Sequence, residues 1–122
     1  MGRIEEFTLE GKKFIYLDMS NFREVDEYNK LIEESIPLIT KHSEFSIYTV
    51  TNIEGVRFDS EVKKSIAMWM ERNKPYVKYG AVCGVDGVKK IMLNAIFTLS
   101  GRMNMHTVTS KQEAIDWLLK QG

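Results

Sequence analysis

The sequence has 122 residues, 43% of them hydrophobic, and 17 basic and 17 acidic residues give it a formal net charge of zero. That length fits a single domain over residues 1–122, and the charge balance argues against non-specific nucleic-acid binding, which needs a basic surface. The one cysteine, Cys83, excludes an intramolecular disulfide and fits a reducing compartment. Acidic residues replace the apolar core of a secretion signal, and no apolar run approaches the ~20 residues that span a bilayer. We therefore expect a soluble cytoplasmic protein.

Two strand-like runs open the chain, Ile4–Leu9 and Phe14–Met19. The turn residues between them, Glu10, Gly11 and Lys12, predict a hairpin. The second run has apolar residues at both odd- and even-numbered positions, which is typical of a strand buried on both faces. Val25–Thr40 then carries apolar residues at steps of three and four, and this spacing predicts a helix.

The rest of the chain alternates strand and helix patterns. Strands are expected where β-branched and aromatic residues cluster, and helices where a capping residue precedes apolar residues at helical spacing. The expected elements are a strand over Phe45–Thr51, a helix from the N-cap Asp59 to about Asn73, a strand over Val77–Val85, a helix over about Val88–Ser100, a strand over Asn104–Val108, and a helix from the capping box at Ser110 through Leu118.

The element order is thus β-β-α-β-α-β-α-β-α. Helical crossovers return the chain in the same direction, so the sheet should be mainly parallel, with the first strand antiparallel because only a short turn joins it to the second. The prediction is an α/β domain with a five-stranded mixed sheet and four helices.

Three segments resemble the small SpoIIAA-like proteins, the STAS and Sec14-like group, also called anti-sigma-factor-antagonist-like. They are I-Y-L-D-M-S-N-F-R-E-V-D (residues 15–26), N-K-P-Y-V-K-Y-G-A-V-C-G-V-D-G-V-K-K-I (73–91) and S-K-Q-E-A-I-D-W-L-L (110–119). Their order and spacing cover most of the chain. The resemblance implies a SpoIIAA-like fold and bacterial signalling through protein–protein contact.

The chain departs from the family's pattern at one place. Phosphorylated members carry a serine-rich turn after the aspartate of an "ID" motif, whereas the aspartate here is Asp26 and Glu27, Tyr28 and Asn29 follow it. Ser20 matches the strand-end serine of the pattern and not the phosphorylated one. The resemblance therefore does not imply phosphorylation at the family's usual site.

Polar residues follow the predicted parallel strands at the edge where α/β folds usually bind ligands. Asp18, Ser20 and Asn21 lie at the end of the second strand or just after it, and Asn52 and Asp86 follow the next two strands. These residues are candidates for a binding edge. The other interpretation is local, because Ser, Asn and Asp also close turns and cap helices.

The helix over 88–100 has apolar residues on more than one side. Val88, Ile91, Met92, Ala95, Ile96 and Leu99 form one broad face, which we assign to the core. Leu93 and Phe97 then lie on the other side, and we expect them to form an exposed contact for a partner, for a second copy or for an apolar ligand. The alternative is that neighbouring loops or the last helix cover them.

No cofactor or metal site is indicated. Cys83, His42 and His106 are far apart in the sequence, and the glycines at 84 and 87 fit neither common phosphate-binding motif. We expect a non-catalytic interaction module with a protein partner or a second copy as its target. The alternative is a binder of a lipid or another apolar small molecule.

Overall fold

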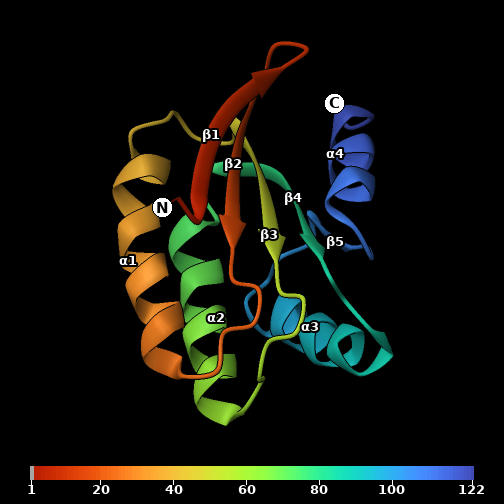
Figure 1. Cartoon of the computed structure of the whole chain (residues 1–122). Helices are drawn as coiled ribbons and strands as arrows, with labels where there is room; N and C mark the ends of the chain where they lie inside the picture. The colour runs from red at the N-terminus through yellow and green to blue at the C-terminus, as the bar shows by residue number, and fades with distance from the viewer. Residues whose placement is uncertain (1) are drawn as a thin grey trace.

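The computed structural model describes residues 2–122 and contains one five-stranded sheet with four helices (Figure 1). The elements are β1 (Ile4–Leu9), β2 (Lys12–Asp18), α1 (Val25–Thr40), β3 (Ile47–Asn52), α2 (Ser60–Asn73), β4 (Val77–Cys83), α3 (Gly87–Leu99), β5 (Met105–Thr107) and α4 (Lys111–Leu119). This order and the α/β class confirm the prediction from the sequence.

The strands lie side by side in chain order, β1-β2-β3-β4-β5. β1 pairs with β2 in the antiparallel direction through a turn at Glu10 and Gly11, whose φ angles of 49° and 78° are the positive values that a tight hairpin turn requires. All later pairings are parallel. Because the strand order never reverses, the sheet has no switch point of the kind that opens a ligand crevice in doubly wound folds.

The two faces of the sheet are covered differently. Alternate residues of β2 point to opposite faces, so Ile15 and Leu17 join a large core with α1, α2 and α3, while Phe14 and Tyr16 join a smaller core with α4. Figure 1 shows α1 and α2 side by side, with α4 apart from them near β4. Helix α4 alone therefore covers one face, and three helices cover the other.

Candidate functional site

The strand-end residues Asp18 and Asn52 are brought together as predicted. They are register partners at the ends of β2 and β3, and the Asn52 amide nitrogen lies 3.5 Å from Asp18 Oδ1 and 3.3 Å from the Tyr16 hydroxyl. The first turn of α4 adds Lys111, whose ammonium lies 3.9 Å from the centre of the Tyr16 ring and 3.6 Å from a carboxylate oxygen of Glu5. The result is a half-buried polar cluster on the α4 face.

Ser20 and Asn21 shape the turn that follows β2. The Ser20 backbone N–H donates to Asp18 Oδ1 at 3.0 Å, and the Asn21 N–H donates to the carbonyl oxygen of Glu54 at 2.8 Å. Asn21 has a φ of 62°, and a side chain at Gly55 would meet the Asn21 amide oxygen at 2.3 Å. These contacts lock the turn after β2 against the loop after β3, which is the local hydrogen-bonding role left open by the sequence.

Asp86 serves a different purpose from the Asp18–Asn52 pair. Its carboxylate accepts a hydrogen bond from the Lys89 backbone N–H at 2.9 Å, and so caps α3, and it lies 3.6 Å from the Lys89 ammonium. The hydrogen bond from the Lys89 backbone is the main reason that the pKa of Asp86 lies below its usual value. The residue shares the sheet edge with Asp18 and Asn52, but its polar contacts go to Lys89.

Arg3 is a member of this edge that the sequence analysis missed. Its guanidinium donates to the carbonyl oxygens of Asp18 at 3.0 Å and Ser20 at 3.1 Å, and it stacks over the Phe22 ring at 4.6 Å. The position of Arg3 could have been predicted from the register of the hairpin. A turn at Glu10 and Gly11 sets Ile4 opposite Leu17, which places Arg3 opposite Asp18.

The exposed contact expected at Leu93 and Phe97 is wrong. Leu93 is 1% exposed and Phe97 is 6% exposed, because α3 turns this side toward the large core shared with α1 and α2. The face assigned to the core is instead largely outside, with Val88 70%, Ile91 73% and Leu99 81% exposed. Two members of that face differ, because Ile96 is buried and Met92 is half-buried.

Together with the exposed Ala95, these residues form what we call the α3 stripe: Val88, Ile91, Ala95 and Leu99. They recur at three- and four-residue steps and so run along one side of the helix. The helix carries two lysines, Lys89 and Lys90, and no acidic residue. The α3 stripe is thus an apolar surface without carboxylates.

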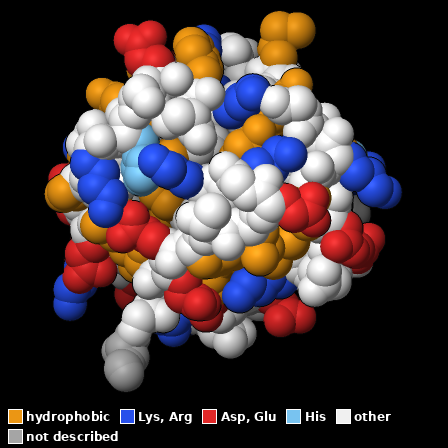
Figure 2. Space-filling model, turned by 90° about the horizontal axis from the view of Figure 1, so that it is seen from above, with side chains coloured by type: hydrophobic (Ala, Val, Ile, Leu, Met, Phe, Trp, Pro, Cys, Tyr) orange, Lys and Arg blue, Asp and Glu red, His pale blue; other side chains and the backbone are white. Residues whose placement is uncertain are grey.

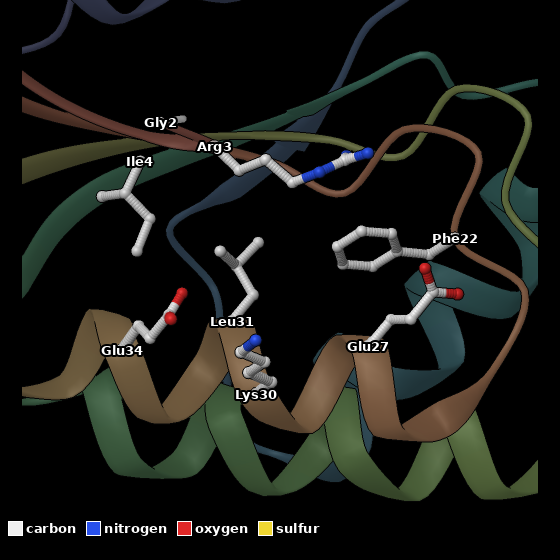
Figure 3. Close-up of a pocket in the computed structure, with 8 residues that line it drawn as sticks. All are labelled: Gly2, Arg3, Ile4, Phe22, Glu27, Lys30, Leu31 and Glu34. Atoms are coloured by element: carbon white, nitrogen blue, oxygen red, sulfur yellow. The ribbon is translucent and has the colours of Figure 1, made fainter.

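A groove of about 580 Å³ lies between the start of β1 and the outer side of α1. Figure 3 shows Ile4 and Arg3 on one wall, Leu31 reaching toward them from α1, and Phe22 at one end. Glu27, Lys30 and Glu34 also line the groove from α1. It is open to solvent and has a mixed apolar and charged lining.

At the end of the sheet that carries the Glu10–Gly11 turn, the surface has both charged and hydrophobic side chains. Figure 2 looks onto the molecule from this end and shows acidic and basic side chains interspersed, with hydrophobic side chains between them. Phe45, in the loop before β3, is 58% exposed. In that view, neither acidic nor basic side chains form a patch of their own at this end.

The groups that could supply nucleophilic or metal chemistry lie apart. Cys83 is 1% exposed, and burial raises the pKa of its thiol to about 11, which disfavours the reactive thiolate. Among residues 2–122, no three His, Cys, Asp or Glu side chains are grouped so that they could hold a metal ion. In the same part of the chain, no helix is long and apolar enough to cross a membrane.

The arrangement of strands and helices defines an α/β protein with the STAS, or SpoIIAA-like, fold. One similar solved structure is "The Structure of an Anti-sigma-factor antagonist (STAS) domain protein from Planctomyces limnophilus", with a TM-score of 0.62 and 16% sequence identity over 96% of this chain and 98% of that chain. No family model matches the sequence, and no curated protein matches it either. The fold predicted from the three sequence segments is confirmed.

Proposed function

We propose that the protein is a non-catalytic regulatory module that binds another protein through the α3 stripe. The observation that carries this proposal is the orientation of α3. The helix has two apolar sides, and it buries the smaller one, with Leu93 and Phe97, while leaving Val88, Ile91 and Leu99 in solvent. Contiguous exposed apolar residues on a small domain are typical of an interaction site.

The fold gives this proposal its regulatory character. The similar Planctomyces limnophilus protein is described as an anti-sigma-factor antagonist domain protein, and we carry the idea of regulation by protein contact over to this chain. Asp26 lies exposed in the first turn of α1, and no serine follows it directly. We propose that binding here does not depend on phosphorylation at that position.

The test is a charge placed in the α3 stripe. Ile91→Asp should leave the far-ultraviolet circular dichroism spectrum unchanged, because the side chain is already 73% exposed, and should abolish partner binding, because a carboxylate would have to be buried in an apolar contact. A photoreactive amino acid at position 91, introduced in cells, identifies the partner, and the purified pair is then titrated with each variant.

The matched control is Asn94→Asp, which adds the same charge on the exposed flank of the same helix. Retained binding in this control, with binding lost in Ile91→Asp, supports the α3 stripe. Equal affinity of both variants for the partner would rule it out.

The alternative function is binding of a lipid or another apolar small molecule. Such a ligand favours an enclosed apolar cavity, whereas the groove between β1 and α1 is open and carries the charges of Arg3, Glu27, Lys30 and Glu34. The geometry therefore favours the interaction module. A native mass spectrum that shows an extra mass, lost on denaturation, would support the small-molecule binder instead.

A further inference from the structure

The outer edge of β1 offers backbone hydrogen-bonding groups to another chain. The Asp18 N–H donates to the Arg3 carbonyl oxygen at 2.7 Å, so the odd-numbered residues of β1 face β2. In an antiparallel pair this direction alternates. The backbone N–H and C=O groups of Ile4, Glu6 and Thr8 therefore point away from the sheet.

The other edge of the sheet is much less suited to pairing. β5 has three residues, Met105–Thr107, whereas β1 has six. Short edge strands and charged side chains are the usual protections against edge pairing. β1 lacks the first protection.

The acidic side chains of β1 would provide the second protection, but in this structure lysine side chains pair with them and offset their charge. Glu6 lies 2.9 Å from the Lys41 ammonium, and Glu5 lies 3.6 Å from the Lys111 ammonium. An added chain would then meet ion pairs and not a row of isolated carboxylates. The edge of β1 therefore stays polar but does not strongly repel an added chain.

The groove lies where the side chains of an added strand would point. Ile4 faces α1, and the groove continues from Ile4 over Leu31 to Phe22 (Figure 3). A strand hydrogen-bonded to β1 would roof this groove, because its alternate side chains point to the same face as Ile4. An unpaired backbone edge and a side-chain groove thus lie next to each other.

We propose that β1 and this groove form a binding site for an extended peptide of a partner protein, which adds to the sheet as a sixth strand. Main-chain hydrogen bonds to Ile4, Glu6 and Thr8 would provide affinity, and the groove would select an apolar side chain that packs on Leu31 and Ile4. Lys30 and Glu34 flank that position with charges of both signs. This site is separate from the α3 stripe and does not depend on it.

The test uses a displayed library of linear ten-residue peptides selected on the whole purified chain. An enriched peptide should carry an apolar residue at a fixed position and should slow amide hydrogen exchange at Ile4, Glu6 and Thr8. The amides of Glu5 and Phe7, already bonded to β2, should not change. This two-residue alternation distinguishes strand addition from a peptide that only fills the groove.

Two variants remove the site in different ways. Thr8→Pro removes one outward N–H and no bond to β2, and should weaken binding at least tenfold, while Thr8→Val keeps the N–H and the affinity. Glu34→Trp fills the groove from an exposed helix position and should also weaken binding at least tenfold. Asn29→Trp makes the same change at an exposed position of α1 that does not line the groove, and should not.

Several results would overturn the proposal. No enriched peptide, slowed exchange without the alternation, or equal binding by Glu34→Trp and Asn29→Trp would each contradict it. Protection of Ile4, Glu6 and Thr8 that rises with protein concentration, without peptide, would assign the edge to a second copy of this chain instead.

Discussion

Cys83 shows how burial alone controls the chemistry of one residue. It ends β4 beside Asn52, in the smaller core that β2, β3 and β4 form with α4. The largest cause of the raised thiol pKa is loss of solvation, and nearby Asp18 raises it further. The neutral thiol is therefore the form that the folded chain stabilises.

This shift predicts a pH dependence of stability. The thiol pKa is about 11 in the folded chain, above the value of 9.0 for a free cysteine. Above pH 9 the unfolded chain loses its proton first, so stability decreases as the pH rises from about 9 to 11. In urea denaturation across this pH range, the free energy of unfolding of the wild type should fall more than that of Cys83→Ala. Burial also raises the pKa of Tyr16 and Tyr28 in the folded chain, so these tyrosines add to the loss of stability at high pH in both proteins. The difference between the two proteins is therefore the quantity to measure.

If the difference in the free energy of unfolding between the wild type and Cys83→Ala were the same at every pH, the raised thiol pKa would be contradicted. Labelling gives an independent check, because a thiol-specific reagent at pH 8 should react with Cys83 only after urea has unfolded the chain. Fast labelling of the folded protein would mean that the thiol is accessible.

At the scale of elements, local sequence predicted the strands and helices well because turns and caps mark their ends. The Glu10–Gly11 turn, the N-cap Asp59 and the capping serine Ser110 all lie where the sequence placed them. Each of these signals acts within a few residues, so no tertiary contact is needed to interpret it.

The orientation of α3 could not be predicted in this way. Apolar residues occupy two sides of the helix, so periodicity supports either side as the buried one. The contacts with α2 and with the rest of the large core decide, and they select Leu93, Ile96 and Phe97. The same limit applies to the candidate site, where the strand ends of Asp18 and Asn52 were predictable but Arg3 needed the pairing of β1 with β2.

Arg102 joins elements that are distant in the sequence, and its replacement should be costly. The residue is 4% exposed, and its guanidinium donates to the Met70 carbonyl oxygen at the end of α2 and to the amide oxygens of Asn73 and Asn104. Arg102→Lys keeps the charge but cannot make this set of bonds. We expect the free energy of unfolding in urea to fall by roughly 2 kcal/mol or more, since buried acceptors lose their donors.

The control for this prediction is Arg57→Lys, because Arg57 is exposed and its ion pair with Asp59, at 3.9 Å, is solvent-accessible. Surface pairs of this kind contribute little. If Arg102→Lys were as stable as Arg57→Lys, the buried network would not be a tie between α2 and the segment before β5.

At the scale of the whole molecule, one sheet serves two cores of unequal size. Among residues 2–122, twenty buried residues form the core with α1, α2 and α3, and eight form the core with α4. The smaller core has few residues of its own, so α4 depends on β3 and β4 being in place. The reverse dependence also holds, because Phe14 and Tyr16 share β2 with Ile15 and Leu17.

The two tryptophans make this coupling measurable, since Trp69 lies in the large core and Trp117 packs on the small one. We expect Trp69→Phe and Trp117→Phe, each with one remaining tryptophan, to show a fluorescence transition in urea that coincides with loss of helical circular dichroism in the same variant. Coincidence follows because neither core can lose its strands without the other. If the Trp117 signal changed at lower urea than the circular dichroism, α4 would be a separately unfolding element. The face of the sheet that it covers would then be open to ligands in the folded protein.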